Sequence, residues 1–184
     1  MKITLVAVLK LTFSIFSFLI ASDHSFSQAE RVSVAKGKGA YQCLPCGNEC
    51  DNSSFTQPGK CPHCQMPLVK KATIRFKEIS PADICNYISS HSNTILLDVR
   101  TREEFEEKAD PNFGVLKNSI NIPVQELETR IGEINHLKKK EIIVYCSHSH
   151  RSPRASYILT QHGFRNVINM SGGMSVMKDK ACIK

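Results

Sequence analysis

The chain contains no tryptophan, no internal repeat and no basic stripe with interleaved aromatic residues. Its formal net charge is +7, from 24 Lys and Arg against 17 Asp and Glu. The lysines are scattered, apart from the runs at 70–71 and 138–140. Nucleic-acid-binding domains cluster such charge on one face, so the sequence supports no nucleic-acid partner. The charge weakly favours a small anionic substrate or an anionic membrane surface.

The sequence also lacks an apolar run that would span a membrane comfortably. Lys2 and Lys10 precede an apolar stretch over residues 11–21, which is shorter than the roughly 20 residues of a spanning helix. The segment 27–29, Ser-Gln-Ala, then supplies small residues where a signal peptidase reads them. We therefore predict a signal peptide over residues 1–29 and an exported, periplasmic or otherwise extracytoplasmic, protein. The alternative is an uncleaved anchor, which would be the protein's membrane contact.

Composition divides the rest of the chain into three parts. Residues 30–40 read as a linker, residues 41–71 as a cysteine-rich module, and residues 72–184 as a domain with alternating strand and helix signals. Strands are expected over 73–76, 94–99, 119–123, 141–145 and 166–170, and helices after Ser80 and Thr101 and over 124–137 and 153–162. Residues 101–104 (TREE) predict a capping box at the start of the helix after Thr101. Alternation at these lengths predicts an α/β fold, with a parallel sheet covered by helices on both faces.

Cys146 follows the apolar run 142–145 and opens a polar loop that ends at Arg151. Ser152 can act as the N-cap of the next helix and Pro153 as its first residue, which needs no N–H. The cysteine is therefore expected where a strand ends and a helix begins. Loop N–H groups and the positive end of the helix stabilise a thiolate or a bound oxyanion there. This placement predicts a reactive thiol.

Residues from about 73 to 178 resemble a single rhodanese domain, the sulfurtransferase family. The resemblance rests on the following segments, which occur in the family's order: 96–101 (LLDVRT) with Glu104-Phe105, 119–123 (SINIP), 144–146 (VYC) through Arg151-Ser152, Gly163-Phe164, and 170–174 (MSGGM). It implies a rhodanese-like fold and an enzyme that carries sulfur on Cys146.

The Cys-x4-Arg spacing of Cys146 and Arg151 resembles the sulfurtransferase loop, which is sized for one extra sulfur atom. Related phosphatases and arsenate reductases of this fold have one more loop residue. The resemblance implies a double displacement without a cofactor: Cys146 takes sulfur from a small anionic donor such as thiosulfate. An acceptor then removes it, either cyanide or a thiol, which would be a small thiol or a thioredoxin-like protein.

The resemblance assigns Cys146 and Arg151 as catalytic residues. Arg151 either binds the anionic donor or braces the loop through Asp98 or Glu104. The remaining site residues are substrate-binding (Ser147, His148, Ser149, His150, Ser152) and structural (Asp98, Arg100, Glu104).

Two features of the loop depart from the family. Ser149 and His150 stand where a glycine often precedes the arginine, so a positive φ at Ser149 would be strained. His148 and His150 are expected to be solvent-exposed and would make the loop charge vary with pH near ~6–7. Of the other cysteines, Cys85 is expected in the core. Cys182 is expected as an exposed thiol, or alternatively as a resolving thiol for the Cys146 persulfide.

The cysteine-rich module contains two Cys-x2-Cys pairs, Cys43 with Cys46 and Cys61 with Cys64. Four thiolates at this spacing suit a tetrahedral Zn²⁺ ion. The segment around Cys61 resembles a small heavy-metal-binding domain found beside bacterial metal-efflux components. Cu(I), or disulfides in an oxidising compartment, are the alternatives, and Cys50 is the odd thiol. A non-catalytic metal- or thiol-binding protein that uses the rhodanese fold for docking is therefore the alternative function.

Overall fold

The computed structural model describes residues 34–35 and 39–184, so the predicted signal peptide lies outside the described residues. Within the described part, no helix is long and apolar enough to cross a membrane. The described strands form two separate sheets, one of four strands and one of five.

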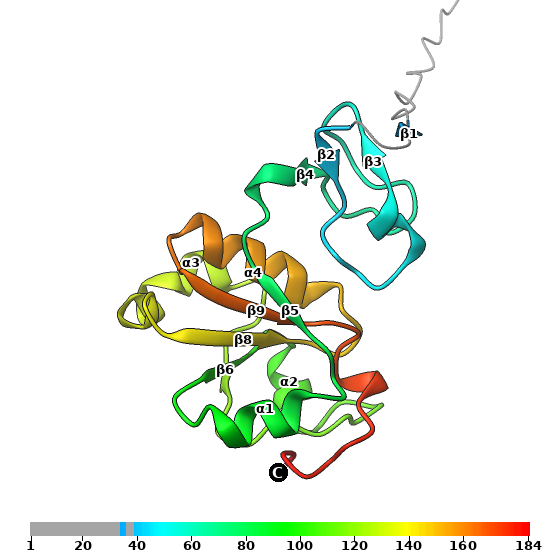
Figure 1. The fold of residues 1–184 in the computed structure, drawn as a ribbon. Coiled ribbons are helices and arrows are strands. Elements are labelled where there is room, and N and C mark those ends of the chain that lie inside the picture. The colour runs from blue at the N-terminus through cyan, green and yellow to red at the C-terminus, as the bar shows by residue number, and fades with distance from the viewer. Residues whose placement is uncertain (1–33, 36–38) are drawn as a thin grey trace, which may run out of the picture. The chain divides into compact units, whose positions relative to one another are not determined.

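The five-stranded sheet has the order β5-β9-β8-β6-β7, and all of its strand pairs are parallel (Figure 1). Its strands are β5 (Lys77–Ile79), β6 (Ile95–Asp98), β7 (Ile120–Asn121), β8 (Glu141–Tyr145) and β9 (Asn166–Met170). The central strand β8 and its neighbour β6 are short and largely apolar, as expected for strands buried on both faces. The predicted parallel sheet is therefore confirmed.

Helices cover both faces of this sheet (Figure 1). The helical elements are α1 (Ile84–Ser90), α2 (Arg102–Phe105), α3 (Leu127–Arg130), the 3-10 helix η3 (Ile131–Leu137), α4 (Arg151–Gln161) and the 3-10 helix η4 (Met174–Val176). Because strand side chains alternate between faces, Val144 packs with Leu127 and Leu159 on the α3–α4 side. Ile143 packs with Ile84 on the α1 side.

Three expected elements differ from the structure. The strand expected over 73–76 is wrong: β5 begins at Lys77, where the chain meets the edge of β9, and residues 71–73 form the 3-10 turn η2 (Lys71–Thr73). The helix expected over 124–137 begins only at Leu127 and continues as 3-10 helix. The last helix begins at Arg151, with His150 as its N-cap residue, so Ser152 is not the cap.

The C-terminal segment is attached to the domain by a disulfide between Cys85 of α1 and Cys182. The expectation of an exposed Cys182 thiol is therefore wrong, and so is the resolving role, because the sulfur is already bonded. Cys85 is buried, as expected, but as half of this disulfide. Ile183 forms an isolated antiparallel bridge with Leu116, which holds the tail along the segment that follows α2.

The four-stranded sheet is formed by the cysteine-rich module together with β1, which lies in the segment predicted as a linker, and it has the order β1-β3-β2-β4. Its strands are β1 (Val34–Ala35), β2 (Tyr41–Gln42), β3 (Ser54–Phe55) and β4 (Val69–Lys70), and the 3-10 helix η1 spans Glu49–Asn52. All of its strand pairs are antiparallel. Strands of two residues bury little apolar surface, so a metal or other cross-links are needed to stabilise this module.

Candidate functional site

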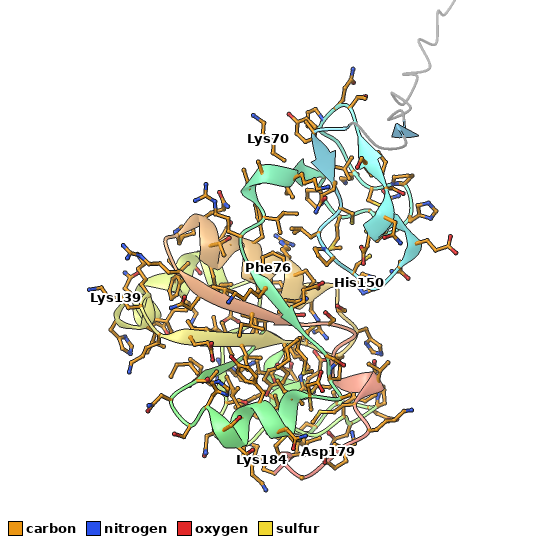
Figure 2. All side chains as sticks on the ribbon, viewed as in Figure 1. Lys70, Phe76, Lys139, His150, Asp179 and Lys184 are labelled. Atoms are coloured by element: carbon orange, nitrogen blue, oxygen red, sulfur yellow. A yellow bond between two sulfur atoms is a disulfide. The ribbon has the colours of Figure 1, made fainter. Side chains whose placement is uncertain are left out.

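Cys146 follows β8 directly and opens the loop that leads into α4. Ser147 and Ser149 are buried, whereas His148 and His150 are exposed, as expected. His150 lies directly before α4 (Figure 2). The loop thus alternates buried hydroxyls with exposed imidazoles. It lies at the carboxyl end of a central parallel strand, where open α/β sheets place their sites.

Ser149 has φ of +59°. A left-handed conformation is unfavourable for a residue with a Cβ atom, so the strain that the missing glycine implied is present. The positive φ turns the chain back toward α4 within five residues. None of the backbone N–H groups of residues 147–150 donates a hydrogen bond to another group among the described residues. These donors are therefore free to bind an anion beside Cys146.

The Cys146 thiol is completely buried and lies 3.3 Å from the Ser152 hydroxyl. Because α4 begins two residues earlier than expected, Ser152 lies inside its first turn and faces the thiol. Pro153 is tolerated there, since the first helical N–H groups have no partner within the helix. The structure therefore places Ser152 beside the sulfur atom, in contact with the candidate nucleophile.

Arg151 forms an ion pair with Glu104, with 2.7 Å between its Nη2 and the carboxylate Oε1. The same carboxylate accepts the Ser147 hydroxyl at 2.7 Å and the Thr101 N–H at 3.0 Å. Burial opposes ionisation of Glu104, but the Arg151 and Ser147 hydrogen bonds outweigh it and lower its pKa to about 2. The hydrogen bond to Glu104 raises the pKa of Arg151. Of the two roles left open for Arg151, the structure shows the bracing contact.

The capping box expected at α2 is present, and it orients Glu104. The Thr101 hydroxyl accepts the Glu104 N–H, and the Glu104 carboxylate accepts the Thr101 N–H. This reciprocal pairing fixes both ends of the first helical turn. A helix-start signal that is local in sequence therefore orients the Glu104 carboxylate toward a loop nearly fifty residues further along the chain.

Asp98 and Arg100 form a second, fully buried ion pair behind the loop. Arg100 donates from Nη2 to Asp98 at 2.7 Å and to the Gly114 carbonyl at 2.9 Å. Burial disfavours the charged form of Arg100, but the Asp98 hydrogen bond raises its pKa. Because such a pair is costly to break once buried, it fixes the chain that follows β6. Neither side chain touches Cys146 through a hydrogen bond or ion pair.

Sequence reasoning missed the turn after β9 as a support of the loop. Met174 donates its N–H to the Cys146 carbonyl at 2.8 Å, and Ser175 donates to the Ser147 carbonyl at 3.0 Å. Gly173 has φ of +72°, and a Cβ there would lie 2.5 Å from the Ser147 backbone. Only glycine allows this approach. The Gly172-Gly173 pair directly after a strand was the available signal.

The cysteine-rich module brings five thiols together. Four of them, Cys43, Cys50, Cys61 and Cys64, have sulfur atoms within 4.8 Å of one another, a group that could hold a metal ion. This group differs from the predicted ligand set at one place, because it contains Cys50 and not Cys46. Cys50 lies in the 3-10 helix η1 and is completely buried, which the spacing of the cysteines alone did not indicate.

The donor chemistry of this cluster fits a thiophilic cation. Burial raises the pKa of both Cys43 and Cys50. A hydrogen bond with Cys64 raises the pKa of Cys43 further, and a hydrogen bond with Cys46 does the same for Cys50. Neighbouring sulfurs that resist ionisation on their own are stabilised as thiolates by a shared metal ion. Cys61 opens a tight turn, in which Gln65 donates its N–H to the Cys61 carbonyl at 2.9 Å.

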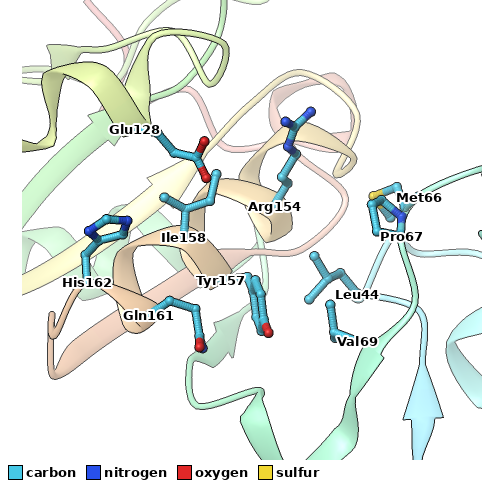
Figure 3. Close-up of a pocket in the computed structure, with 10 residues that line it drawn as sticks. All are labelled: Leu44, Met66, Pro67, Val69, Glu128, Arg154, Tyr157, Ile158, Gln161 and His162. Atoms are coloured by element: carbon cyan, nitrogen blue, oxygen red, sulfur yellow. The ribbon is translucent and has the colours of Figure 1, made fainter. Parts of the chain in front are cut away.

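A pocket of about 220 Å³ lies on another part of the chain. Figure 3 shows its lining, which includes Arg154, Tyr157, Ile158 and Gln161 of α4. Its surface is largely apolar, and neither Cys146 nor another thiol lines it. The pocket therefore lacks the chemistry of the loop.

The fold and the loop define an α/β protein with a cysteine at the carboxyl end of a central parallel strand. The sequence profile of the rhodanese-like domain matches residues 82–180, more than half of the chain. This chain belongs to the rhodanese-like domain family.

Curated relatives include proteins named tRNA uridine(34) hydroxylase. The protein from Yersinia enterocolitica is 29% identical over 104 residues, 54% of this chain and 28% of the relative. The protein from Pectobacterium atrosepticum is 27% identical over 97 residues, 50% of this chain and 26% of the relative. The chain thus spans less than a third of these relatives' length.

Similar solved structures include a rhodanese-related protein from Thermoplasma volcanium, 31% identical with a TM-score of 0.45, covering 54% of this chain and 87% of that one. An NAD-dependent persulfide reductase from A. fulgidus is 33% identical with a TM-score of 0.40, covering 54% of this chain and 15% of that one.

Proposed function

We propose that this chain is an exported sulfurtransferase that moves sulfane sulfur from a small anionic donor such as thiosulfate to a thiol or cyanide acceptor. The observation that carries the proposal is Cys146 at the head of a Cys-x4-Arg loop whose N–H groups at 147–150 have no acceptor among the described residues. A persulfide anion is a ligand that such donors stabilise beside a helix N-terminus. The rhodanese-like family is consistent with this chemistry.

The reaction consists of two displacements at sulfur. The Cys146 thiolate attacks the outer sulfur of thiosulfate, the S–S bond of the donor breaks, and sulfite leaves with the bonding electron pair. The loop N–H groups hold the resulting Cys146 persulfide. An acceptor thiolate then attacks the terminal sulfur and leaves as a persulfide, and the electron pair returns to Cys146. Covalent catalysis thus divides one transfer into two steps.

The neighbouring residues position the loop for this reaction. Glu104 holds Arg151 and Ser147, and Ser152 accepts a hydrogen bond from the resting Cys146 thiol. Because Glu104 compensates the charge of Arg151, the anionic sulfur donor is bound chiefly by the backbone N–H groups of the loop. The buried thiol also requires the donor to enter through the loop, which favours a compact donor.

The cysteine-rich module is proposed to bind Zn²⁺, with Cu(I) as the competing cation, because its donors are thiols and tetrahedral thiolate sites suit Zn²⁺. This is a structural role that the sulfur-transfer steps do not use. The acceptor is proposed to be a small thiol or a thioredoxin-like protein, and no nucleic-acid partner is proposed.

A non-catalytic metal- or thiol-binding protein is the second candidate. Two observations favour it: Cys146 has no exposed surface, and Arg151 is already paired with Glu104. In that case the module would bind its metal and the rhodanese-like domain would dock a partner, without turnover.

Thiosulfate treatment followed by mass spectrometry tests the proposal. The reduced protein should gain the mass of one sulfur atom on the peptide that contains Cys146, and cyanide should remove it with release of thiocyanate. The matched control is Cys146→Ser, which should neither gain the atom nor form thiocyanate. A wild-type protein that binds metal but never acquires the sulfur atom would support the non-catalytic alternative.

A further inference from the structure

The cysteine cluster offers more donors than one tetrahedral ion uses. Its ligand atoms form two groups, each with all atoms within 4.8 Å of one another: Cys43, Cys50, Cys61 and Cys64 in the first, and Cys43, Cys46, Cys50 and Asp51 in the second. The groups have Cys43 and Cys50 in common. Together they contain six donors, five thiols and one carboxylate.

Six donors with two in common are the number that two edge-sharing tetrahedra require. Each metal ion then has four ligands, as Zn²⁺ prefers, and the shared edge consists of two sulfur atoms. We propose that the module is a dinuclear site for divalent d¹⁰ cations such as Zn²⁺, in which the Cys43 and Cys50 thiolates bridge the two ions. This inference rests on the proposed metal binding of the module.

The second group is arranged around Cys46. Its Sγ lies 3.4 Å from the Cys50 Sγ and 3.3 Å from the Asp51 Oδ1. Cys46 is only 3% exposed and Cys50 is fully buried. The Cys46 thiol is thus in contact with both the Cys50 sulfur and a carboxylate, so a cation that replaces its proton would lie among donors that are already close together.

Asp51 is oriented in the way that outer-shell hydrogen bonds orient a ligating carboxylate. It accepts the Cys46 N–H at 2.9 Å on Oδ1 and the Gly47 N–H at 2.7 Å on Oδ2. A carboxylate has about four lone-pair positions, so these bonds leave one on Oδ1 for a cation. The contact of Oδ1 with the Cys46 Sγ places that position on the side of the cluster.

Charge also favours two ions. When fully ionised, the six donors carry six negative charges; one divalent cation leaves four of them, and two cations leave two. Four of the five sulfurs are at most 3% exposed, so solvent screens them poorly. No Lys or Arg in the described part of the chain forms an ion pair with Asp51. Additional cations must therefore come from solution.

Metal stoichiometry tests the inference. The full chain is loaded with excess Zn²⁺ under reducing anaerobic conditions and desalted, and zinc per chain is measured by native mass spectrometry and elemental analysis. We expect two zinc ions in the wild type and one in Asp51→Asn, Cys46→Ala and Cys61→Ala. The Cys146→Ser variant, which alters no module cysteine, should retain two.

The outcomes distinguish the dinuclear site from the proposed metal binding on which it rests. No bound zinc overturns both. One zinc in the wild type, unchanged by Asp51→Asn, overturns the dinuclear site alone and leaves Cys46 as a thiol hydrogen-bonded to Asp51. Co²⁺ loading of the wild type provides a second readout that needs no variant. Thiolate bridges couple two Co²⁺ ions and weaken their paramagnetic resonance signal, whereas full signal from fully loaded protein contradicts bridging.

Discussion

Glu104 holds the Cys146 loop through three hydrogen-bond partners. It accepts hydrogen bonds from the Arg151 guanidinium, the Ser147 hydroxyl and the Thr101 N–H, so one carboxylate joins both ends of the loop to α2. Its side chain is 17% exposed, which protects the ion pair from solvent screening. Arg151 thereby acts as a brace in the resting structure, although its charge lies next to the site.

Glu104→Gln should lower the free energy of unfolding at pH 7 by about 2–3 kcal/mol, because the folded pKa of Glu104 is lowered from 4.5 to about 2. A lowered folded pKa contributes stability above the unfolded pKa and loses it as pH falls through the folded pKa. The difference between wild type and variant should therefore narrow between pH 4.5 and pH 2. Urea unfolding across this range measures it.

Glu106→Gln is the matched control, since Glu106 pairs with Lys108 on the open surface. Exposed pairs contribute little, so its unfolding curve should follow the wild type at each pH. Equal stability of wild type and Glu104→Gln at pH 7 would contradict the bracing role.

At the scale of elements, the C-terminal tail joins α1 to the segment before β7. The disulfide links α1 to residue 182, Lys117 donates its N–H to the Cys182 carbonyl at 2.9 Å, and Lys184 donates to Val115 at 3.0 Å. Ile183 lies against Gly114, whose carbonyl accepts from Arg100. One residue earlier, Phe113 packs edge-on against His148 with ring centroids 5.3 Å apart. The tail thus supports a segment that touches the loop.

Removing this disulfide should destabilise the domain. The crosslink spans 97 residues, and disulfides typically contribute about 2–4 kcal/mol, largely by restricting the unfolded chain. Cys182→Ser should lower the midpoint of chemical unfolding, and hydrogen exchange should show faster exchange at residues 114–117. The double variant Cys85→Ser/Cys182→Ser is the control for the unpaired thiol and should match it. Unchanged hydrogen exchange at residues 114–117 would show that the disulfide-bonded tail does not stabilise the segment that touches the loop.

At the scale of the whole molecule, the chain combines two sheets with different sources of stability. The rhodanese-like domain buries two apolar clusters, one on each face of its sheet. The cysteine-rich module has one small cluster, composed mainly of the cysteines themselves with Phe55 and Leu68. The proposed metal ion would replace the core that the module is too small to build.

Chelation should therefore act on the smaller sheet only. Removing metal under reducing conditions should increase hydrogen exchange across residues 41–70, while β6 and β8 keep their protection. Adding Zn²⁺ back should restore the protection of the module. Loss of protection in β8 on chelation would show that the larger sheet also depends on the metal.

Local sequence determined much of this protein. The apolar runs at 95–98 and 141–145, the capping box at Thr101 and the spacing of Cys146 and Arg151 each act within a few residues, so they could be predicted without the fold. The alternation of strand and helix signals also determined the parallel sheet, because apolar strands buried on both faces need helices above and below.

Tertiary structure alone decided the pairings between distant residues: Arg151 with Glu104, Cys85 with Cys182, and the Gly173 turn with the Cys146 carbonyl. It also placed Cys50 rather than Cys46 in the four-thiol group and moved Ser152 from a helix cap to the Cys146 sulfur. Each of these depends on where the backbone returns after tens of residues. Sequence spacing records distance along the chain, whereas the chemistry of this protein depends on distance across the fold.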